Sequence, residues 1–159
     1  MTTRTAGDGA AVVLDDTSRR IVELLQQDGR RPYAAIAKSV GLSEAAVRQR
    51  VQRLLDAEVM QIVAVADPKR LGFQRQAMVG LKIDGDLGEA ARRLAELDEV
   101  DYVVVCAGSF DLLVEVICED DDHLLSVLND HIRNTPGVTN TETFVYLRLE
   151  KETYLWGSR

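Results

Sequence analysis

The sequence predicts an α+β protein of two modules, an all-helical module followed by one in which strands and helices alternate. Apolar residues recur at helical spacing from Asp15 to Leu55, and after Ala77 segments of period two alternate with further helical segments. The stretch Asp67–Gly72 separates the two patterns, because Pro68 stops a helix and Gly72 supplies a turn. A chain of 159 residues has room for two small cores.

These breaks predict the domain boundaries. We expect a flexible tail over residues 1–13, a winged helix-turn-helix domain over 14–65, a linker over 66–75 and a ferredoxin-like domain over 76–159. With 46% hydrophobic and 28% charged residues, the composition is that of an ordinary globular protein. There is no apolar run of about 20 residues and no signal peptide, so we expect a cytoplasmic protein without a membrane partner. Cys106 and Cys118 lie in apolar runs, which favours buried free thiols.

The distribution of charge changes what the net charge implies. The formal charge of −7 by itself argues against a nucleic-acid partner. However, Leu14–Gly72 hold ten Lys and Arg against eight Asp and Glu, a balance of +2, whereas Phe73–Arg159 hold eight against 17, a balance of −9. This asymmetry indicates two modules with different partners.

Three helices are predicted in the first module. The first has a stripe of Ile21, Leu24 and Leu25, can be capped by Asp16 or Ser18, and ends at Asp28-Gly29. The second covers Pro32–Val40. Gly41 fits a left-handed stop, and Ser43 can cap a third helix, whose apolar positions are Val47, Val51, Leu54 and Leu55. Two helices joined by a short Gly-containing turn are typical of a helix-turn-helix.

The outward face of the third helix favours DNA binding. Opposite the apolar stripe lie Ala45, Gln49, Gln52 and Arg53, flanked by Arg48 and Arg50. Gln and Arg can hydrogen-bond to adenine and guanine edges, and flanking Arg suits phosphates. The alternative is the solvated face of a three-helix bundle. The β-branched stretch Val59–Val65 then predicts a strand that forms a small wing or pairs with a partner chain.

The second module has the order strand, helix, strand, strand, helix, strand of the ferredoxin-like βαββαβ arrangement. The expected elements are Ala77–Ile83, Leu87–Leu97, Val100–Ala107, Leu112–Cys118, Asp121–Asn134 and Val138–Leu149. In the second helix we expect Leu124, Leu125, Leu128 and Ile132 to point inward, and in the last strand Thr141, Thr143, Val145 and Leu147 to share a face. Two helices cover one face of such a sheet. The other face is apolar at many positions, so we expect it to be covered by a second copy in a homodimer.

The second module offers no catalytic constellation. His123 and His131 are eight positions apart, about 80° around a helix, and do not converge. The acidic run Glu119–Asp122 suits a helix start. We therefore expect no enzyme activity and no metal site. The loop Gly108–Asp111 has two readings: simple turn chemistry, or a ligand site in which Gly108 takes unusual torsions and Asp111 accepts from an ammonium group.

With both modules described, the chain resembles the Lrp/AsnC family of transcription regulators over Leu14–Glu152. The resemblance rests on the order and spacing of several segments: Leu14–Asp16 with Ile21, Leu25–Arg30, Ile36–Ser43, Val47–Leu54, Asp67–Pro68 with Leu71–Gly72, Ala107–Asp111, and Pro136–Val138. It implies a winged helix-turn-helix joined to a ferredoxin-like (RAM/ACT-like) domain that mediates assembly and senses amino acids. It further implies dimers that assemble to tetramers or octamers.

The resemblance also implies site residues. An amino acid or related small molecule would bind as effector, with no cofactor, near Gly108, Ser109, Phe110 and Asp111, with Asp121, Thr141 and Thr143 as weaker candidates. Two positions depart from the family pattern. Ser18 replaces an Asp, and we expect no change since Ser also caps helices. Glu58 replaces a Gly, so we expect the third helix to end differently and the elbow between the modules to be altered.

The leading hypothesis is a sequence-specific DNA-binding regulator whose dimer inserts two third helices into successive major grooves. In this hypothesis Ser43, Ala45, Gln49, Gln52 and Arg53 face bases, whereas Lys38, Arg48 and Arg50 lie nearer phosphates. The alternative is an architectural DNA-compacting protein that works without a small effector.

Overall fold

The computed structural model describes residues 13–153, so nearly all of the predicted tail over residues 1–13 lies outside the described part of the chain. The chain divides into two compact units, each described by itself. Among the described residues, the first comprises those up to Ala64 together with Lys151–Thr153, and the second spans Val65–Glu150. Among the described helices, none has the length and hydropathy required to cross a membrane.

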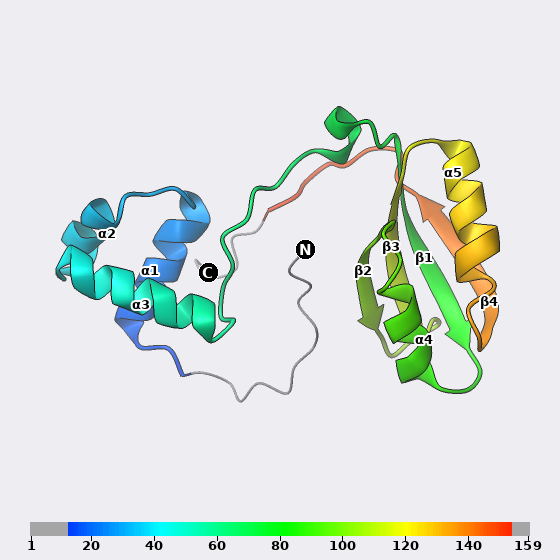
Figure 1. The fold of residues 1–159 in the computed structure, drawn as a ribbon, viewed down its shortest axis with the longest axis horizontal. Coiled ribbons are helices and arrows are strands. Elements are labelled where there is room, and N and C mark those ends of the chain that lie inside the picture. Colours follow the sequence, from blue (N-terminus) through cyan, green and yellow to red (C-terminus); the bar gives the residue numbers. More distant parts are fainter. Residues whose placement is uncertain (1–12, 154–159) are drawn as a thin grey trace. The chain divides into compact units, whose positions relative to one another are not determined.

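The N-terminal unit contains α1 (Asp16–Gln27), α2 (Tyr33–Val40) and α3 (Glu44–Asp56), shown in Figure 1. Their apolar stripes meet in one core, as the helical spacing predicts: Ile21, Leu24, Leu25, Ile36, Ala37, Val47, Val51 and Leu54. The turn between α2 and α3 also has the predicted form. Gly41 is left-handed with φ 69°, and the Ser43 hydroxyl accepts a bond of 3.2 Å from the Ala46 amide. The helix-turn-helix prediction is confirmed.

The start of α1 corrects the predicted cap. Asp15, not Asp16 or Ser18, is the N-cap, and its Oδ1 accepts a 2.7 Å hydrogen bond from the Ser18 amide. A capping side chain has to precede the helical residues and reach the amide three positions on, which only Asp15 does here. Ser18 instead lies within the first turn and is buried. Pro32, expected as the first residue of α2, lies at its N-cap position, just before Tyr33, and makes no side-chain capping bond.

The end of α3 also differs from expectation. Glu58 was expected to force a different ending, but it adopts the left-handed conformation itself, with φ 53°. Its amide donates to Leu55 O at 3.0 Å, and the Val59 amide donates to Leu54 O at 3.0 Å. These are the bonds of a Gly-type helix stop. The backbone geometry is retained, and Glu58 adopts it at a steric cost.

The strand predicted over Val59–Val65 does not form within the described chain, and its pairing with a partner chain stays a prediction. No described segment pairs with it, and Ile62, Val63 and Val65 are exposed. A strand exists only where its amides and carbonyls bond to a neighbouring strand, so β-branched composition does not create one alone. The segment that follows contains a short 3₁₀ helix, η1 (Pro68–Leu71), which is capped by Asp67 and ends at Gly72, with φ 103°.

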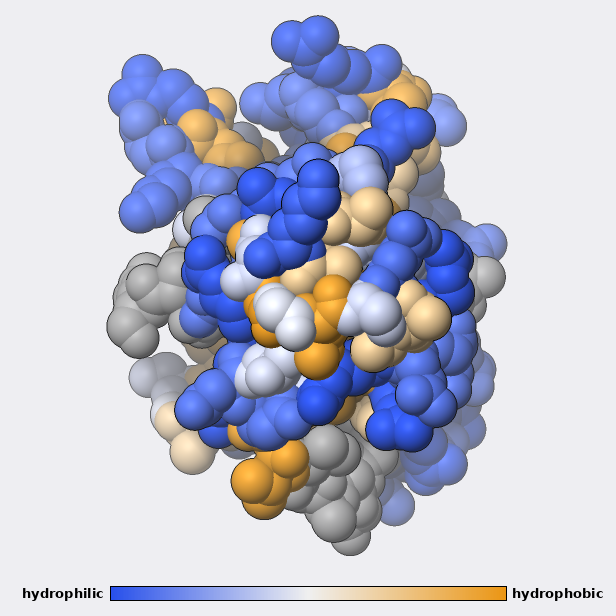
Figure 2. Space-filling model, turned by 90° about the vertical axis from the view of Figure 1, so that its left-hand side faces the viewer, coloured by the Kyte–Doolittle hydropathy of each residue, from blue (hydrophilic) through white to orange (hydrophobic). Residues whose placement is uncertain are grey.

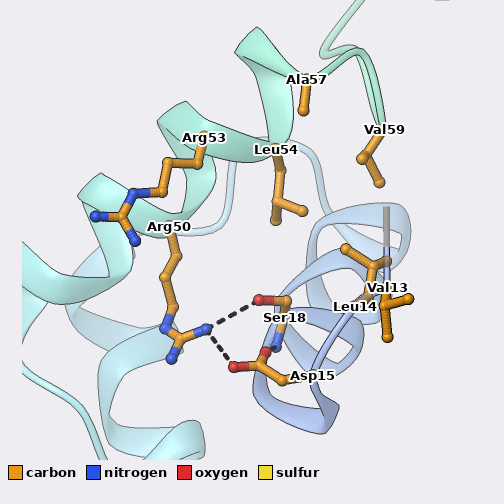
Figure 3. Close-up of a pocket in the computed structure, with 9 residues that line it drawn as sticks. All are labelled: Val13, Leu14, Asp15, Ser18, Arg50, Arg53, Leu54, Ala57 and Val59. Carbon is orange, nitrogen blue, oxygen red and sulfur yellow. Dashed lines mark hydrogen bonds and ion pairs between the residues drawn. The ribbon is translucent and has the colours of Figure 1, made fainter. Parts of the chain in front are cut away.

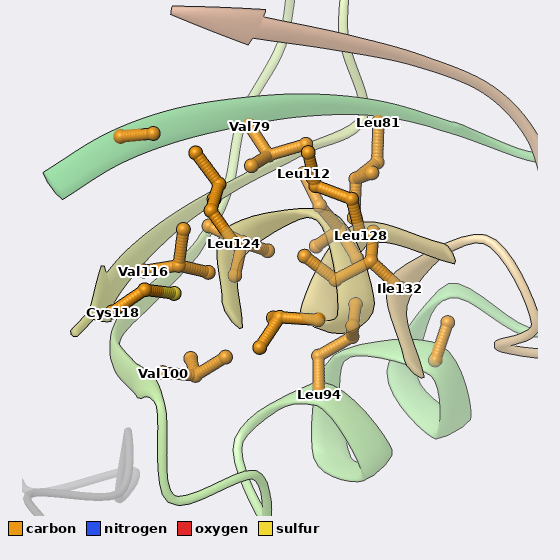
Figure 4. Packing of buried hydrophobic residues seen from close by; sticks show 14 residues of the cluster. Val79, Leu81, Leu94, Val100, Leu112, Val116, Cys118, Leu124, Leu128 and Ile132 are labelled. Carbon is orange, nitrogen blue, oxygen red and sulfur yellow. The ribbon is translucent and has the colours of Figure 1, made fainter. Parts of the chain in front are cut away.

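The second unit is a four-stranded antiparallel sheet with two helical segments, as the ferredoxin-like prediction requires. Its elements are β1 (Arg75–Ile83), α4 (Leu87–Leu94), β2 (Val100–Val105), β3 (Leu112–Cys118), α5 (Asp121–Ser126), η2 (Val127–Ile132) and β4 (Val138–Val145). The strand order is β2-β3-β1-β4, with β1 central between β3 and β4. Figure 4 shows the core between the helices and one sheet face, where Val79, Leu81, Val116 and Leu128 meet.

Three predicted elements end earlier than expected. The helix predicted over Leu87–Leu97 stops at Leu94, because a turn in which the Val100 amide bonds to Leu97 O leads into β2. The strand predicted over Val100–Ala107 stops at Val105. The last strand stops at Val145, which pairs with Ala77, two positions after the first residue of β1.

The helix predicted over Asp121–Asn134 is α5 followed by η2, a π-helical stretch. Leu125 lies in α5, ahead of the π stretch, and is turned about 100° around the helix from Leu124. Leu124, Leu128 and Ile132, spaced by four, are buried as expected, whereas the prediction for Leu125 is wrong: it is 55% exposed, and Val127 takes a place in the core instead.

The sheet face away from the helices is largely apolar. The strand register places on it Met78, Tyr102, Leu113, Ile117 and Phe144, which we call the open sheet face. Met78, Leu113 and Ile117 are half-buried, and Tyr102 and Phe144 are exposed.

Candidate nucleic-acid interface and effector loop

The outer surface of α3 is exposed and polar, as the helical wheel predicts. Ala45, Arg48, Gln49, Gln52 and Arg53 are all exposed, and so is Lys38 on α2. Figure 2 views the molecule from the side of the N-terminal unit and shows a small area of apolar and weakly polar side chains ringed by hydrophilic ones. The exposed side chains of α3 offer groups that can hydrogen-bond to base edges, and the cations Arg48 and Lys38 can reach phosphates.

The polar side chains of α3 differ in how free they are. The side chains of Gln49 and Arg53 have no hydrogen bond or ion pair with any described residue. Arg48 pairs with Glu44 of its own helix, Nη2 to Oε1 at 2.9 Å, and its guanidinium lies 5.2 Å from the centre of the Tyr33 ring. This contact extends Arg48 toward the start of α2. The amide of Gln52 donates to Asp56 at 2.8 Å.

The Arg50 side chain bonds to the start of α1 (Figure 3). Its Nη1 donates to Asp15 Oδ2 at 2.7 Å and to Ser18 Oγ at 3.0 Å, so the side chain lies along α1. Hydrogen bonds from Ser18, together with the Arg50 guanidinium, lower the pKa of Asp15 to about 2. Beside this cluster is a hollow of about 290 Å³ between α1 and α3, with an apolar wall that includes Leu14, Leu54 and Val59.

The loop between β2 and β3 holds the predicted effector motif. The expectation of unusual torsions at Gly108 is wrong, since Gly108 is not among the glycines with positive φ. Gly108 and Ser109 are exposed. The Phe110 ring covers Gly80 of β1 so closely that a Cβ there would lie 2.6 Å from the ring, and its edge meets Phe144 with centroids 6.3 Å apart. Phe110 therefore lies on the open sheet face.

The side chain of Asp111 is not free, and it does not bond to its own turn. Its Oδ2 accepts from the Ile83 amide at 2.9 Å, and Lys82 Nζ lies 3.3 Å from its Oδ1. The pKa of Asp111 lies below its ordinary value, mainly because of the hydrogen bond from the Ile83 amide and to a smaller extent because of Lys82. The Asp111 amide also donates to Leu81 O at 2.8 Å. The hairpin is thus tied to the end of β1.

The three weaker effector candidates do not join this loop within one protomer. Both carboxylate oxygens of Asp121 bond to Arg75, at the opposite end of β1 from Ile83. Thr141 and Thr143 pair with Leu81 and Val79, so they lie on the helix side of the sheet, away from Phe110.

Four residues of these sites were missed by sequence reasoning: Asp15, Tyr33, Gly80 and Lys82. Only Lys82 gave a signal, as a cation in an otherwise apolar strand. The others act through partners distant in sequence. Within residues 13–153, no group of three or more His, Cys, Asp or Glu side chains is arranged to hold a metal ion. Cys118 is buried as predicted, but Cys106 is only half-buried.

An exposed polar recognition helix joined to a separate α+β unit with an apolar sheet face defines a DNA-binding regulator with an assembly domain. The family comparisons agree with this class. The AsnC-type helix-turn-helix domain matches residues 14–55, and a C-terminal dimeric alpha+beta barrel domain of AsnC-type regulators matches residues 73–159. The chain belongs to the Lrp/AsnC family, whose members are DNA-binding transcriptional regulators and not enzymes.

Individual relatives are similar over nearly their full length. HTH-type transcriptional regulator FL11 of Pyrococcus abyssi is 33% identical over 144 residues, which cover 89% of this chain and 95% of the relative. Escherichia coli AsnC has a TM-score of 0.80 at 27% identity, covering 90% of this chain and 98% of its own. The leucine response regulatory protein LrpA of Mycobacterium tuberculosis has a TM-score of 0.78 at 30% identity, covering 87% and 96%.

Proposed function

We propose that the protein recognises particular DNA sequences as an assembly of two or more copies, and that a small amino-acid-type effector changes its assembly or DNA affinity. Residues 14–65 would bind DNA, 66–75 would link, and 76–159 would assemble and bind the effector. The observation that carries the DNA part is the freedom of Gln49 and Arg53 on the exposed side of α3. Both side chains keep their full hydrogen-bonding capacity for base edges.

The residues of α3 have different roles in this proposal. Ser43, Ala45, Gln49, Gln52 and Arg53 face bases, while Lys38 and Arg48 approach phosphates, with Arg48 held extended by Tyr33. Replacing Arg53 with Ala should cost about 1–3 kcal/mol of binding to a site with guanine at that position, and Arg48→Ala should weaken all sequences alike. Gel-shift titrations on a site selected in vitro from random duplexes measure both. If neither variant differs from wild type, the assigned face is wrong.

The assembly proposal starts from the open sheet face. An exposed apolar sheet of this kind is typical of a face that a second copy covers. The matched domain family is described as dimeric, which supports a dimer as the first step. We propose that dimers associate further, to tetramers or octamers, and light scattering over a concentration series measures which species form.

The effector proposal starts from the charges at Gly108–Asp111. Lys82 and Asp111 present a cation and a carboxylate side by side, 40% and 33% exposed, next to the free backbone of Gly108 and Ser109. A zwitterionic amino acid carries the complementary pair of charges. The name of the M. tuberculosis relative refers to a leucine response, which makes leucine the first amino acid to test. Thermal-shift measurements with each amino acid, repeated on Asp111→Ala, test the proposal, and a screen without stabilisation would count heavily against it.

One observation favours the alternative of an architectural DNA-compacting protein. Asp111 and Asp121 are both already paired, with Lys82 and Arg75, so a ligand ammonium has to displace a lysine or an arginine. An effector-independent protein would protect extended stretches of DNA with the same periodicity whether or not amino acids are added. Footprinting in both conditions separates the two functions.

A further inference from the structure

We propose that Arg50 is a positioning residue, which orients the recognition helix by binding Asp15 and Ser18 of α1 and makes no phosphate contact. This inference rests on the proposed DNA contact by α3 and specifies how that helix is held. Arg50 comes from the middle of α3, and Asp15 lies 35 positions earlier, at the start of α1.

The cluster links two helices through one carboxylate. Oδ1 of Asp15 accepts from the Ser18 amide at 2.7 Å and so caps α1, while Oδ2 accepts from Arg50 at 2.7 Å. The same Arg50 nitrogen also donates to the Ser18 hydroxyl at 3.0 Å. Two hydrogen bonds from Arg50 therefore fix the middle of α3 to the first turn of α1, and the capping bond within α1 holds their two acceptors, Asp15 and Ser18, in place. Charge-assisted bonds of this length have narrow geometry.

The other arginines on α3 are placed differently. The Arg48 side chain is 65% exposed and Arg53 is exposed without a partner, whereas the Arg50 side chain is 33% exposed and lies along α1. A phosphate contact by Arg50 would require the guanidinium to leave both acceptors. Asp15 would then lose its cation while it still caps the helix.

Packing explains why this corner needs a polar connection. Apolar contacts of Val47 and Val51 hold α3 against the core, but next to the cluster lies the hollow of about 290 Å³ between α1 and α3. Side chains that line a hollow lack contacts on one side. At this corner the directional hydrogen bonds of Arg50 add to the apolar contacts of Leu14, Leu54 and Val59 in fixing the angle between the two helices. Figure 3 shows the Arg50, Asp15 and Ser18 side chains at the edge of the hollow.

The expected effect on binding follows from orientation. Without Arg50, α3 samples several orientations, of which one is competent to bind DNA. The apparent affinity falls in proportion to the fraction of molecules in that orientation, roughly three- to tenfold. A partly exposed ion pair adds little to stability, so the protein should remain folded. The number of neutralised phosphates does not change. The slope of log K against log salt concentration should therefore stay at the wild-type value in Arg50→Ala, and in Arg48→Ala its magnitude should decrease by about 0.9 per recognition unit, or about 1.8 for a bound dimer.

Asp15→Asn gives the sharpest test, because the two roles of Arg50 predict opposite signs. Asn still caps a helix but removes the charge that binds Arg50. If Arg50 positions α3, Asp15→Asn weakens DNA binding, and the double variant Asp15→Asn/Arg50→Ala is no weaker than Arg50→Ala. If Arg50 binds phosphate, Asp15→Asn frees it and tightens binding. Asp16→Asn is the matched control, since it removes a neighbouring carboxylate that has no partner among the described residues.

A readout without DNA keeps the inference separate from the proposed function. Amide hydrogen exchange of the full-length protein should be faster in α1 and α3 for Arg50→Ala and Asp15→Asn, and unchanged for the control Asp16→Asn. Exchange that is unchanged in both Arg50→Ala and Asp15→Asn would overturn the inference, as would a reduced salt slope in Arg50→Ala or tighter binding by Asp15→Asn. Failure of the wild-type protein to select any DNA site would overturn the proposed function instead.

Discussion

Glu58 shows how one residue holds a strained backbone at the end of the recognition helix. At φ 53° its Cβ crowds the following carbonyl oxygen, which costs a non-glycine residue about 1–2 kcal/mol. Glycine has no Cβ, although it loses more entropy on folding. We expect Glu58→Gly to raise the free energy of unfolding by about 1 kcal/mol in urea titrations.

Ala57 provides the control for this prediction. It precedes Glu58 with φ −87°, where alanine is unstrained. Ala57→Gly should therefore lower the free energy of unfolding, by up to about 1 kcal/mol. Equal effects of the two substitutions would mean that the strain at Glu58 is not relieved by glycine.

The two thiols should differ in reactivity. Burial is the main cause that raises the pKa of Cys118 to about 11, so at pH 8 only about one molecule in 1000 carries the thiolate. Cys106 is half-buried and donates to Phe110 O at 3.3 Å. We expect one thiol to react rapidly with Ellman's reagent in the native protein and the second only on unfolding. Cys106→Ser should abolish the rapid phase, and its persistence in that variant would contradict the assignment.

At the scale of elements, the hairpin between β2 and β3 is held to β1 by the Phe110 ring over Gly80. A Cβ at position 80 would lie 2.6 Å from the ring, so Gly80→Ala forces Phe110 to move. Overpacking of this kind costs about 1–3 kcal/mol. In a double-mutant cycle, Phe110→Ala makes room for the methyl group, so the double variant should be less destabilised than the sum of the single ones. Additive losses in urea unfolding would show that the ring does not press on Gly80.

The helices of the N-terminal unit could be predicted from sequence because their signals are local. The apolar stripes and the Gly41 and Ser43 positions each lie within one element or turn. Predictions failed where the outcome depends on a distant partner. Within one chain the Val59–Val65 stretch lacks a strand to pair with, and the core position expected for Leu125 is taken by Val127.

The same distinction applies to the candidate site. A helical wheel indicates the side from which Arg50 leaves α3, but its acceptor Asp15 lies 35 positions away. Likewise, the resemblance pointed to Asp111, but not to its bonds with Lys82 and Ile83, which lie on another strand. Sequence reasoning therefore found which residues belong to the exposed surface of α3, and the structure separated those that are free from those that hold the helices together.

At the scale of the whole molecule, the charge distribution connects assembly to DNA binding. The stretch Leu14–Gly72 has a balance of only +2, and Phe73–Arg159 has −9. A single mildly basic recognition unit neutralises few phosphates, so it should bind DNA weakly, and an acidic second unit repels the rest of the backbone. Tight binding then requires two recognition units on one DNA molecule.

Met78→Glu tests this dependence. Met78 lies at the centre of the open sheet face, on β1 between Glu115 and Phe144 in the register. A carboxylate at this position is repelled by Glu115 and places a charge within the apolar face. We expect light scattering to give a monomer and DNA affinity to fall by about 10²-fold or more. Because a monomer contacts half as many phosphates, the slope of log K against log salt should also fall to about half. Leu125→Glu, which adds the same charge to the exposed side of α5, should leave the dimer and the slope unchanged. A monomeric Met78→Glu protein that binds DNA as tightly as wild type would show that one recognition unit suffices despite its small positive charge.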